Sequence, residues 1–396
     1  MRLICWPLSV VVMVGCLAGC SSEKRPVKTQ QALLEHREAN AKSLAALQTT
    51  YMDRLIARAK AKQDENIAKK IDQPTTIDLL VISGGGDWGA FGAGFLKGWG
   101  TVTGDMARPK FDAVTGVSTG ALIAPFAFLG DDPAINMIES IYRNPNKDWV
   151  KKRGTFYFMP HYESFATIPG LERELRDRMT DSMIHRMAAE HQAGRALLVN
   201  TTDLDDGDMW VWDVGQECQN VVNGGPRDRV MDILLASAGI PAAFPFRIID
   251  GTMYVDGGIT GNILYGGRTK EDQSFHATWK RLYPDRPMPK IRYWVIFNNQ
   301  IVPPPQVTER NWPAVLSRAT VMGTRSATLT SLRHLKTQAE LWKLKYGADI
   351  EVRIAAVPDG WEPPVQGVFN KEVMNALTDI GEKMGADPKA WNTDPF

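Results

Sequence analysis

Apolar residues along the chain follow two spacings, which together predict alternating strands and helices. Short continuous runs rich in Val, Ile and Leu are typical of buried strands, whereas apolar residues three or four positions apart are typical of helices. Runs of the strand type occur at residues 77–82, 195–200 and 351–357, with a shorter one at 254–255. Helical spacing occurs at residues 231–238, 312–350 and 370–385. We therefore interpret the body of the chain as an α/β fold.

The segment before the first strand has a different pattern. Residues 20–73 are polar and rich in Lys, Glu, Gln and Ala. Between Ala32 and Ile56, apolar side chains recur at roughly helical spacing among charged ones, which predicts one or two amphipathic helices with a solvated charged face. We assign this segment to a helical stalk or linker, and residues 74–396 to the main domain.

The N-terminus resembles the signal sequence of a bacterial lipoprotein. A positively charged start precedes an apolar run at residues 3–14, which is too short to span a bilayer. The run leads to Leu17-Ala-Gly-Cys20, in which small residues directly precede a cysteine, as in a lipobox. The resemblance implies that residues 1–19 are removed and that acyl chains on Cys20 anchor the protein. Ser21 implies the outer membrane of a Gram-negative cell, and the alternative is an ordinary signal peptide with an incidental cysteine.

Composition and charge exclude several classes of protein. The 396 residues are 44% hydrophobic and 23% charged, which is ordinary for a globular chain with a large core. The net charge of +1 and the lack of a basic stripe argue against nucleic acid as a partner. Three of the four cysteines fall in the first twenty residues, so neither a disulfide framework nor a Cys/His metal cluster is predicted. We expect no metal and no cofactor.

The most informative motif is Gly116-Val-Ser118-Thr-Gly120. A short β-prone run from Phe111 precedes it and small apolar residues follow, which places Ser118 at a strand-to-helix turn. This layout is typical of a nucleophile elbow, in which the serine backbone is strained and the flanking glycines leave room for the neighbouring strand and helix. The helix start also offers free N–H groups near the serine oxygen. Because G-x-S-x-G is common, the rest of the chain must supply an oxyanion hole and a base.

A glycine cluster follows the strand at residues 77–82, and its N–H groups can bind an anion. The cluster consists of Gly84, Gly85, Gly86 and Gly89. Its spacing also matches the dinucleotide fingerprint, which expects an acidic residue ending a second strand about twenty residues later. This chain has a loop-like segment there, at residues 99–105. The serine elbow instead follows at the next strand–helix junction, and parallel neighbours place both turns at the carboxyl edge of the sheet. We therefore favour an oxyanion hole.

The third motif is Asp256-Gly257-Gly258, which ends a short strand. Asp250-Gly251, a few residues earlier, is typical of a hairpin turn. A serine hydroxyl is a poor nucleophile unless a base within hydrogen-bond reach accepts its proton. The paired glycines let another loop approach the carboxylate closely, so Asp256 is the candidate base. On its own a D-G-G is a common turn, and the hypothesis depends on all three motifs together.

The three motifs in this order resemble the patatin-like phospholipase family, which carries a glycine-rich oxyanion block, a G-x-S-x-G and a D-G-G/A. The resemblance covers about residues 77–300 and includes the segments at 202–205 and 236–244. It implies a three-layer α/β/α fold with a mostly parallel central sheet, here with an N-terminal helical extension. It also implies a lipid-anchored serine acyl hydrolase of phospholipase or lysophospholipase type, which acts on membrane lipid or lysolipid and needs no cofactor.

The resemblance further implies the roles of individual residues. Ser118 attacks the ester carbonyl, and Asp256 accepts its proton and later activates water, without a histidine. The oxyanion hole is assigned to the N–H groups of Gly84, Gly85 and Gly86, with Thr119. The motif glycines are Gly89, Gly116, Gly120, Gly257 and Gly258. One departure is Trp88, because the family usually has Lys or Arg just before the last glycine of the first block. This keeps neutral esters and lysolipids among the expected substrates.

Two other hypotheses remain open from the sequence. One is a Ser–Asp–His triad esterase that uses His276 or His334. The other is a catalytically inactive surface lipoprotein with a lipid-binding role, for which Trp88 is the motivating feature.

Overall fold

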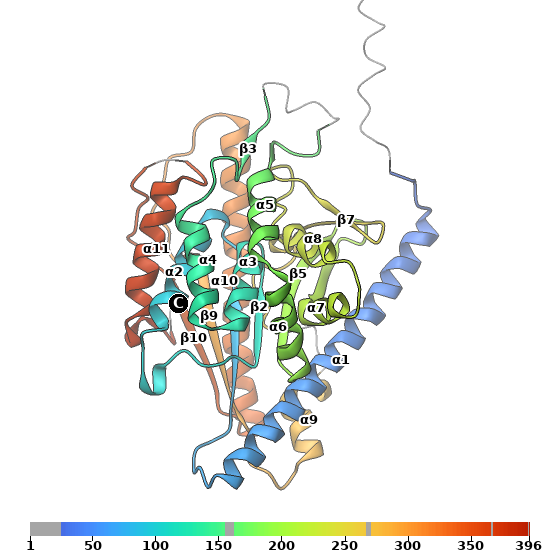
Figure 1. Ribbon diagram of the computed structural model, residues 1–396, viewed down its shortest axis with the longest axis vertical. Helices are drawn as coiled ribbons and strands as arrows, with labels where there is room; N and C mark the ends of the chain where they lie inside the picture. Colours follow the sequence, from blue (N-terminus) through green and yellow to red (C-terminus); the bar gives the residue numbers. More distant parts are fainter. Residues whose placement is uncertain (1–24, 155–161, 267–270, 366, 395) are drawn as a thin grey trace, which may run out of the picture.

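The centre of the molecule is a mixed sheet, seen in a computed structural model that describes residues 25–154, 162–266, 271–365, 367–394 and 396 (Figure 1). The signal sequence and Cys20 lie outside the described residues. The strands of the main sheet are β1 (Thr76–Ile82), β2 (Ala113–Gly116), β5 (Ala196–Asp203), β6 (Asp208–Asp213), β7 (Arg247–Ile249), β8 (Thr252–Asp256), β9 (Lys290–Gln300) and β10 (Ile350–Val357). A separate ribbon pairs β3 (Lys151–Lys152) with β4 (Ala166–Thr167).

The main sheet has eight strands in the order β10-β9-β1-β2-β5-β8-β7, with β6 paired to β5. The five strands from β10 to β5 are parallel neighbours. Strands β6, β7 and β8 join by antiparallel pairing. The β7–β8 turn is the predicted hairpin, with positive φ at both Asp250 and Gly251. The mostly parallel sheet that the sequence predicts is therefore confirmed.

Helices cover both faces of this sheet. The α-helices are α1 (Gln30–Ala68), α2 (Gly89–Trp99), α3 (Thr119–Leu129), α4 (Asp132–Arg143), α5 (Pro169–Arg178), α6 (Asp181–Gln192), α7 (Val214–Val222), α8 (Asp228–Ser237), α9 (Phe275–Leu282), α10 (Trp312–Tyr346) and α11 (Lys371–Gly385). Short 3₁₀ turns lie at Gly86–Trp88, Gly104–Met106, Gly257–Ile259, Glu271–Gln273 and Pro388–Ala390.

Two hydrophobic cores separate the sheet from these helices. Alternate residues of β1 point into different cores, Leu80 and Ile82 into one and Leu79 and Val81 into the other. The first core includes side chains of α2, α3, α4, α8 and α11, and the second includes side chains of α1, α9 and α10. The arrangement is a three-layer α/β/α fold, as expected.

The N-terminal segment forms one long helix, α1, that lies along the body (Figure 1). Leu55, Ile56 and Ala59 are buried in the second core. On the neighbouring turns Arg58 and Lys62 both pair with the buried carboxylate of Asp112, the Lys62 Nζ at 2.7 Å. The second half of the predicted stalk therefore packs on the main domain, because its apolar stripe is satisfied there.

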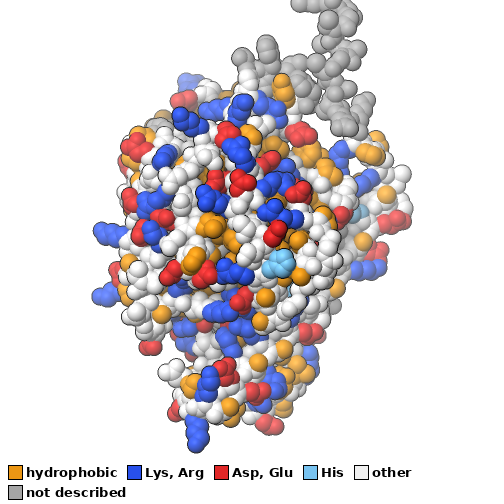
Figure 2. All heavy atoms as spheres, viewed as in Figure 1, with side chains coloured by type: hydrophobic (Ala, Val, Ile, Leu, Met, Phe, Trp, Pro, Cys, Tyr) orange, Lys and Arg blue, Asp and Glu red, His pale blue; other side chains and the backbone are white. Residues whose placement is uncertain are grey.

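The surface seen in Figure 2 mixes charges of both signs, in keeping with the net charge of +1. Within the described ranges, no helix combines the length and the apolar character needed to cross a membrane.

Candidate active site

Strands β2 and β8 approach each other head to head along one edge of β5. Gly116 and Asp256, the last residues of the two strands, pair with the residues of β5 directly before and after Asn200. β6 pairs with the same part of β5 and therefore occupies its other edge. Because β2 is parallel to β5 and β8 is antiparallel, the two carboxyl ends point toward each other. This topology brings Asp256 next to Ser118, which lies 138 positions earlier in the chain.

Ser118 occupies a strained turn between β2 and α3. Its φ is 54° and its ψ is −123°, a conformation that residues other than glycine rarely adopt. A Cβ on Gly116 would lie 2.2 Å from the Gly120 carbonyl oxygen, and one on Gly120 would lie 2.3 Å from the Ile82 carbonyl oxygen. Both positions therefore require glycine, and the turn has the geometry that the G-x-S-x-G pattern predicts.

Ser118 and Asp256 are in direct contact. The Oγ of Ser118 donates to Oδ2 of Asp256 at 2.7 Å, and Oδ1 accepts the backbone N–H of Gly258 at 2.7 Å. Both side chains belong to residues that are only 5% exposed. Burial raises the pKa of Asp256 to about 6, although its two hydrogen bonds act in the opposite direction. A carboxylate with a pKa nearer to neutrality is a better proton acceptor than an ordinary aspartate.

Histidine takes no part in this contact. His276 is buried in α9, where its ring packs near Trp342, and neither ring nitrogen has a hydrogen-bond partner among the described residues. His334 in α10 shares a 2.7 Å hydrogen bond with the hydroxyl of Tyr265. Since the Asp256 carboxylate bonds Ser118 directly, the geometry favours a dyad over a triad.

The glycine-rich turn after β1 lies against the nucleophile. A Cβ on Gly84 would come within 3.0 Å of the Ser118 Cβ and within 2.2 Å of the Asn262 Oδ1. The N–H of Gly84 is donated to the Asn262 carbonyl at 3.2 Å. The structure thus differs from the expectation for Gly84, which provides space beside Ser118 while its N–H is already occupied.

Three other N–H groups near the nucleophile remain available. Within the described ranges, those of Gly85, Gly86 and Thr119 have no hydrogen-bond acceptor. Gly86 has a φ of 61°, which favours glycine, and Thr119 is the first residue of α3. The start of a helix carries unpaired N–H groups and a partial positive charge, which suits a developing oxyanion.

The hydroxyl of Ser237 holds the backbone of the nucleophile in place, a role that the sequence alone does not indicate. The Ser237 Oγ accepts the N–H of Ser118 at 3.0 Å and donates to the carbonyl of Asn200 at 2.7 Å. The Asn200 side chain in turn donates to the Gly257 carbonyl at 3.1 Å. The resemblance to the family includes the segment at 236–244, but only the strand pairing shows what Ser237 contacts.

Asn298, near the end of β9, stabilises the glycine-rich turn through two hydrogen bonds, a role that the sequence alone also does not indicate. Its Nδ2 donates to the Ser83 carbonyl at 2.9 Å, and its Oδ1 accepts the Gly92 N–H at 3.0 Å. A Cβ on Gly85 would lie 2.4 Å from the Asn298 carbonyl oxygen. The turn is therefore held between β9 and α2, and a polar residue at a strand end was the only sequence signal.

Comparison with known families agrees with this geometry. Residues 80–266 match the family described as Patatin-like phospholipase. These residues are therefore similar to a patatin-like phospholipase domain, and we refer to them as the patatin-like domain. A curated relative, the cGAMP-activated phospholipase of Pseudomonas aeruginosa, is 24% identical over 200 residues, which are 47% of this chain and 54% of that protein. The chain therefore spans about half the length of this relative. Among solved structures, VipD from Legionella pneumophila is 10% identical, with a TM-score of 0.33 over 78% of this chain and 67% of that one.

Trp88, which belongs to the glycine-rich turn of the patatin-like domain, packs against an aromatic side chain from the C-terminal part of the chain. Its ring lies edge to face against Trp361, with the centroids 5.2 Å apart. The preceding carboxylate, Asp87, is buried and accepts the Phe369 N–H at 2.7 Å. Burial raises the pKa of Asp87. The segment before α11 therefore covers the position where the family usually has a basic residue.

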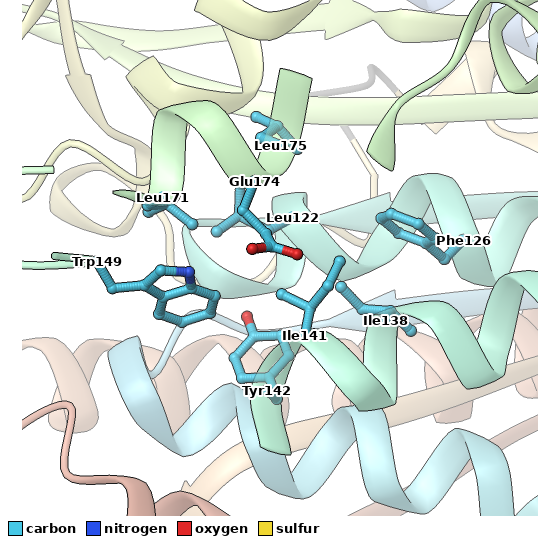
Figure 3. Close-up of a pocket in the computed structure, with 9 residues that line it drawn as sticks. All are labelled: Leu122, Phe126, Ile138, Ile141, Tyr142, Trp149, Leu171, Glu174 and Leu175. Atoms are coloured by element: carbon cyan, nitrogen blue, oxygen red, sulfur yellow. The ribbon is translucent and has the colours of Figure 1, made fainter. Parts of the chain in front are cut away.

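A small apolar pit lies beside the nucleophile helix of the patatin-like domain (Figure 3). Tyr142 on its wall shares a short hydrogen bond with the Thr119 hydroxyl, and Figure 3 shows the Glu174 carboxylate among mostly apolar side chains. The cavity volume is about 20 Å³, which admits about one water molecule. A lipid acyl chain does not fit this pit as it stands. Its lining is Leu122, Phe126, Ile138, Ile141, Tyr142, Trp149, Leu171, Glu174 and Leu175.

Within the part of the chain that the structure describes, no three His, Cys, Asp or Glu side chains gather as metal ligands.

Proposed function

We propose that the protein is a lipid-anchored serine acyl hydrolase that cleaves carboxyl esters of membrane phospholipids or lysophospholipids. Its patatin-like phospholipase domain indicates lipid ester hydrolysis. The observation that carries the finer assignment is the 2.7 Å hydrogen bond between Ser118 Oγ and Asp256 Oδ2. A base within hydrogen-bond reach is what turns a serine hydroxyl into a nucleophile.

In the first half-reaction, Ser118 Oγ attacks the ester carbonyl while its proton passes to Asp256 Oδ2. The carbonyl oxygen becomes an oxyanion, which the N–H groups of Gly85, Gly86 and Thr119 stabilise. The intermediate collapses to an acyl-serine ester, and the leaving alkoxide takes the proton from Asp256. The products are an acyl-enzyme and a lipid alcohol.

In the second half-reaction, Asp256 accepts a proton from water, and the resulting nucleophile attacks the acyl-serine ester. The second tetrahedral intermediate uses the same N–H groups. Its collapse releases the fatty acid, and the proton on Asp256 returns to Ser118 Oγ. The raised pKa of Asp256, about 6, suits a group that must both accept and return a proton near neutral pH.

The contact between Trp88 and Trp361 at the glycine-rich turn suggests which lipids the enzyme prefers. Trp88 and Trp361 place an aromatic surface where a cation would attract a phosphate. We expect the enzyme to accept neutral and zwitterionic lipids or lysolipids at least as well as anionic ones, because no lysine or arginine stands at this position.

The proposed anchor is the acylated Cys20, in the outer membrane of a Gram-negative cell. The supporting observation is the run Leu17-Ala-Gly-Cys20-Ser after an apolar segment. In cells fed radiolabelled palmitate, the parent chain should take up label and fractionate with the outer membrane. A Cys20→Ala variant that is labelled and located like the parent would exclude this anchor.

The enzymatic test is fatty-acid release from vesicles of mixed phospholipid and lysophospholipid by the purified full chain. Ser118→Ala and Asp256→Asn should each lower the rate by about 10³-fold or more, since a dyad acts as a unit. Ser331→Ala, an exposed hydroxyl on α10 bonded only to its own helix, is the matched control and should keep the parent rate.

The same assay separates the competing hypotheses. Loss of turnover in His276→Ala or His334→Ala, with the fold intact, would favour a triad. If the parent releases no fatty acid and a serine-directed fluorophosphonate does not label it, the protein is a binding lipoprotein. Release that survives in Ser118→Ala would exclude the dyad.

A further inference from the structure

Helix α10 extends well beyond the sheet at the edge that carries the dyad. It has 35 residues and is therefore about 52 Å long, whereas the next strand, β10, has 8 residues and spans about 26 Å. Because α10 connects the end of β9 to the start of β10, its N-terminus lies at the carboxyl edge of these parallel strands. The first buried residue of the helix is Thr328, so the turns before it project from the body (Figure 1).

The projecting turns carry an exposed apolar stripe. Trp312, Val315, Leu316 and Met322 are 69%, 55%, 58% and 53% exposed, and their spacing puts them on one side of the helix. We call these four residues the outer stripe. The opposite side holds Arg325, whose guanidinium bonds the Gln300 carbonyl on the body. An apolar helix side normally packs on the core, as Leu329, Leu332 and Leu335 of α10 do, whereas the outer stripe faces away from it.

We propose that the outer stripe is a membrane-contact surface that inserts into the lipid interface and sets the active-site edge against it. This inference rests on the proposed function, since it identifies how that site meets its substrate. A tryptophan beside branched apolar residues, with arginines at 310 and 318 nearby, suits an interface with anionic headgroups. In the connecting loop Val302 and Val307 are also exposed, at 61% and 98%.

The N-terminal segment leads to the same edge. Arg25 donates from both terminal nitrogens to the carboxylate of Asp205, at 2.7 and 2.8 Å. Asp205 lies two residues after Asp203, the carboxyl end of β5, and β5 runs parallel to β1 and β9. The proposed lipid attachment site, Cys20, is only five positions before Arg25. An apolar stripe at this edge, with a proposed anchor only five positions from Arg25 at the same edge, favours a membrane over a protein partner or a second copy.

The test uses the full processed chain bound to vesicles of phosphatidylethanolamine and phosphatidylglycerol. Leu316→Cys in the outer stripe and Leu344→Cys near the far end of the same helix are each labelled with an NBD fluorophore. Leu344 is 87% exposed and is the matched control, and the remaining cysteine of the body, Cys218, is buried. We expect quenching of the label at 316, but not of that at 344, by nitroxide-bearing lipids in the vesicle.

Equal lipid quenching at both positions would overturn the proposal, as would a label at 316 that aqueous iodide quenches fully. Protection from iodide without lipid quenching would show that a protein or a second copy covers the stripe, which also overturns it. The readout does not need turnover, so it can be repeated in Ser118→Ala. A failed dyad and a failed membrane surface are thereby distinguished.

A second measurement keeps the proposal falsifiable if the label disturbs insertion. For the double variant Trp312→Ala/Leu316→Ser, the ratio of vesicle hydrolysis to hydrolysis of a soluble short-chain ester should fall by about threefold or more. The double variant Leu341→Ser/Leu344→Ser, at the other end of α10, should keep the parent ratio. An unchanged ratio in the first variant would contradict the proposal.

Discussion

The hydroxyl of Ser237 accepts the backbone N–H of Ser118 at 3.0 Å. The amide of the nucleophile is therefore committed to holding the strained turn, and the oxyanion donors must come from elsewhere. Ser237→Ala removes this acceptor and leaves a buried N–H unpaired, which loosens the turn. We expect kcat for a soluble ester to fall by about 10- to 100-fold with little change in KM.

The Ser237 prediction needs a readout besides turnover. The rate of fluorophosphonate labelling of Ser118 should fall in parallel with kcat, while the far-UV circular dichroism stays that of the parent. A variant with parent labelling kinetics would show that Ser237 has no positioning role.

The pH dependence of the reaction should report Asp256. The carboxylate must be ionised to accept a proton, and its pKa is raised to about 6, so the active fraction falls as the pH drops through 6. We expect kcat/KM for a soluble ester to fall by about tenfold for each pH unit below this value. Tryptophan fluorescence at pH 5 would establish that the chain is still folded. A half-maximal rate near pH 4 would contradict the raised pKa.

Gly84 should be intolerant of any side chain, although its N–H is not an oxyanion donor. In Gly84→Ala the new Cβ would lie 2.2 Å from the Asn262 Oδ1 and 3.0 Å from the Ser118 Cβ, so the turn or the nucleophile must move. We expect a loss of kcat of about 100-fold or more, because small displacements of reacting groups are costly. Gly360→Ala meets no atom within 4 Å and should behave as the parent. Parent activity in Gly84→Ala would show that the turn has room.

The contact between α1 and the body should matter for stability. Asp112 is fully buried, receives Arg58 and Lys62 from α1, and accepts the Asp78 N–H at 2.9 Å. Asp112→Ala removes the only carboxylate that these two cations contact among the described residues and leaves them with backbone carbonyls alone, which should lower the free energy of unfolding by about 3–5 kcal/mol in urea titrations. Glu65→Ala, which breaks an exposed pair with Lys69 in the same helix, should change little. Equal effects of the two variants would mean that α1 is not held by Asp112.

Local turn chemistry explains why much of the site was predictable. The positions of Ser118, Asp256 and the glycine-rich turn depend on glycines within a few residues of each other, and the sequence displays those directly. Ser237 and Asn298 act through contacts between strands and helices far apart in the chain. The role of Ser237 depends on the pairing of β5 with both β2 and β8, and that of Asn298 on the pairing of β9 with β1, neither of which a local pattern indicates.

The N-terminal segment also shows that a local sequence pattern can predict an element without predicting its contacts. Its helical spacing predicted α1 correctly as helix, but an apolar stripe does not say what it packs against. The docking of Leu55 and Ile56 depends on the second core, to which the strands β1, β2, β5, β9 and β10 from distant parts of the chain contribute. The occupied N–H of Gly84 likewise depends on Asn262, which lies far away in sequence.

The docking of α1 has a consequence for how far the enzyme can reach. If α1 did not pack on the body, this helix of 39 residues would be a spacer about 58 Å long between the proposed acylated cysteine and the catalytic body. Arg25 is held at Asp205, and the proposed anchor at Cys20 is only five positions earlier, a stretch of chain that can span at most about 18 Å. With this proposed anchor, we expect the protein to act in cis, on lipids of the membrane that holds the anchor, and not on lipids of a neighbouring membrane.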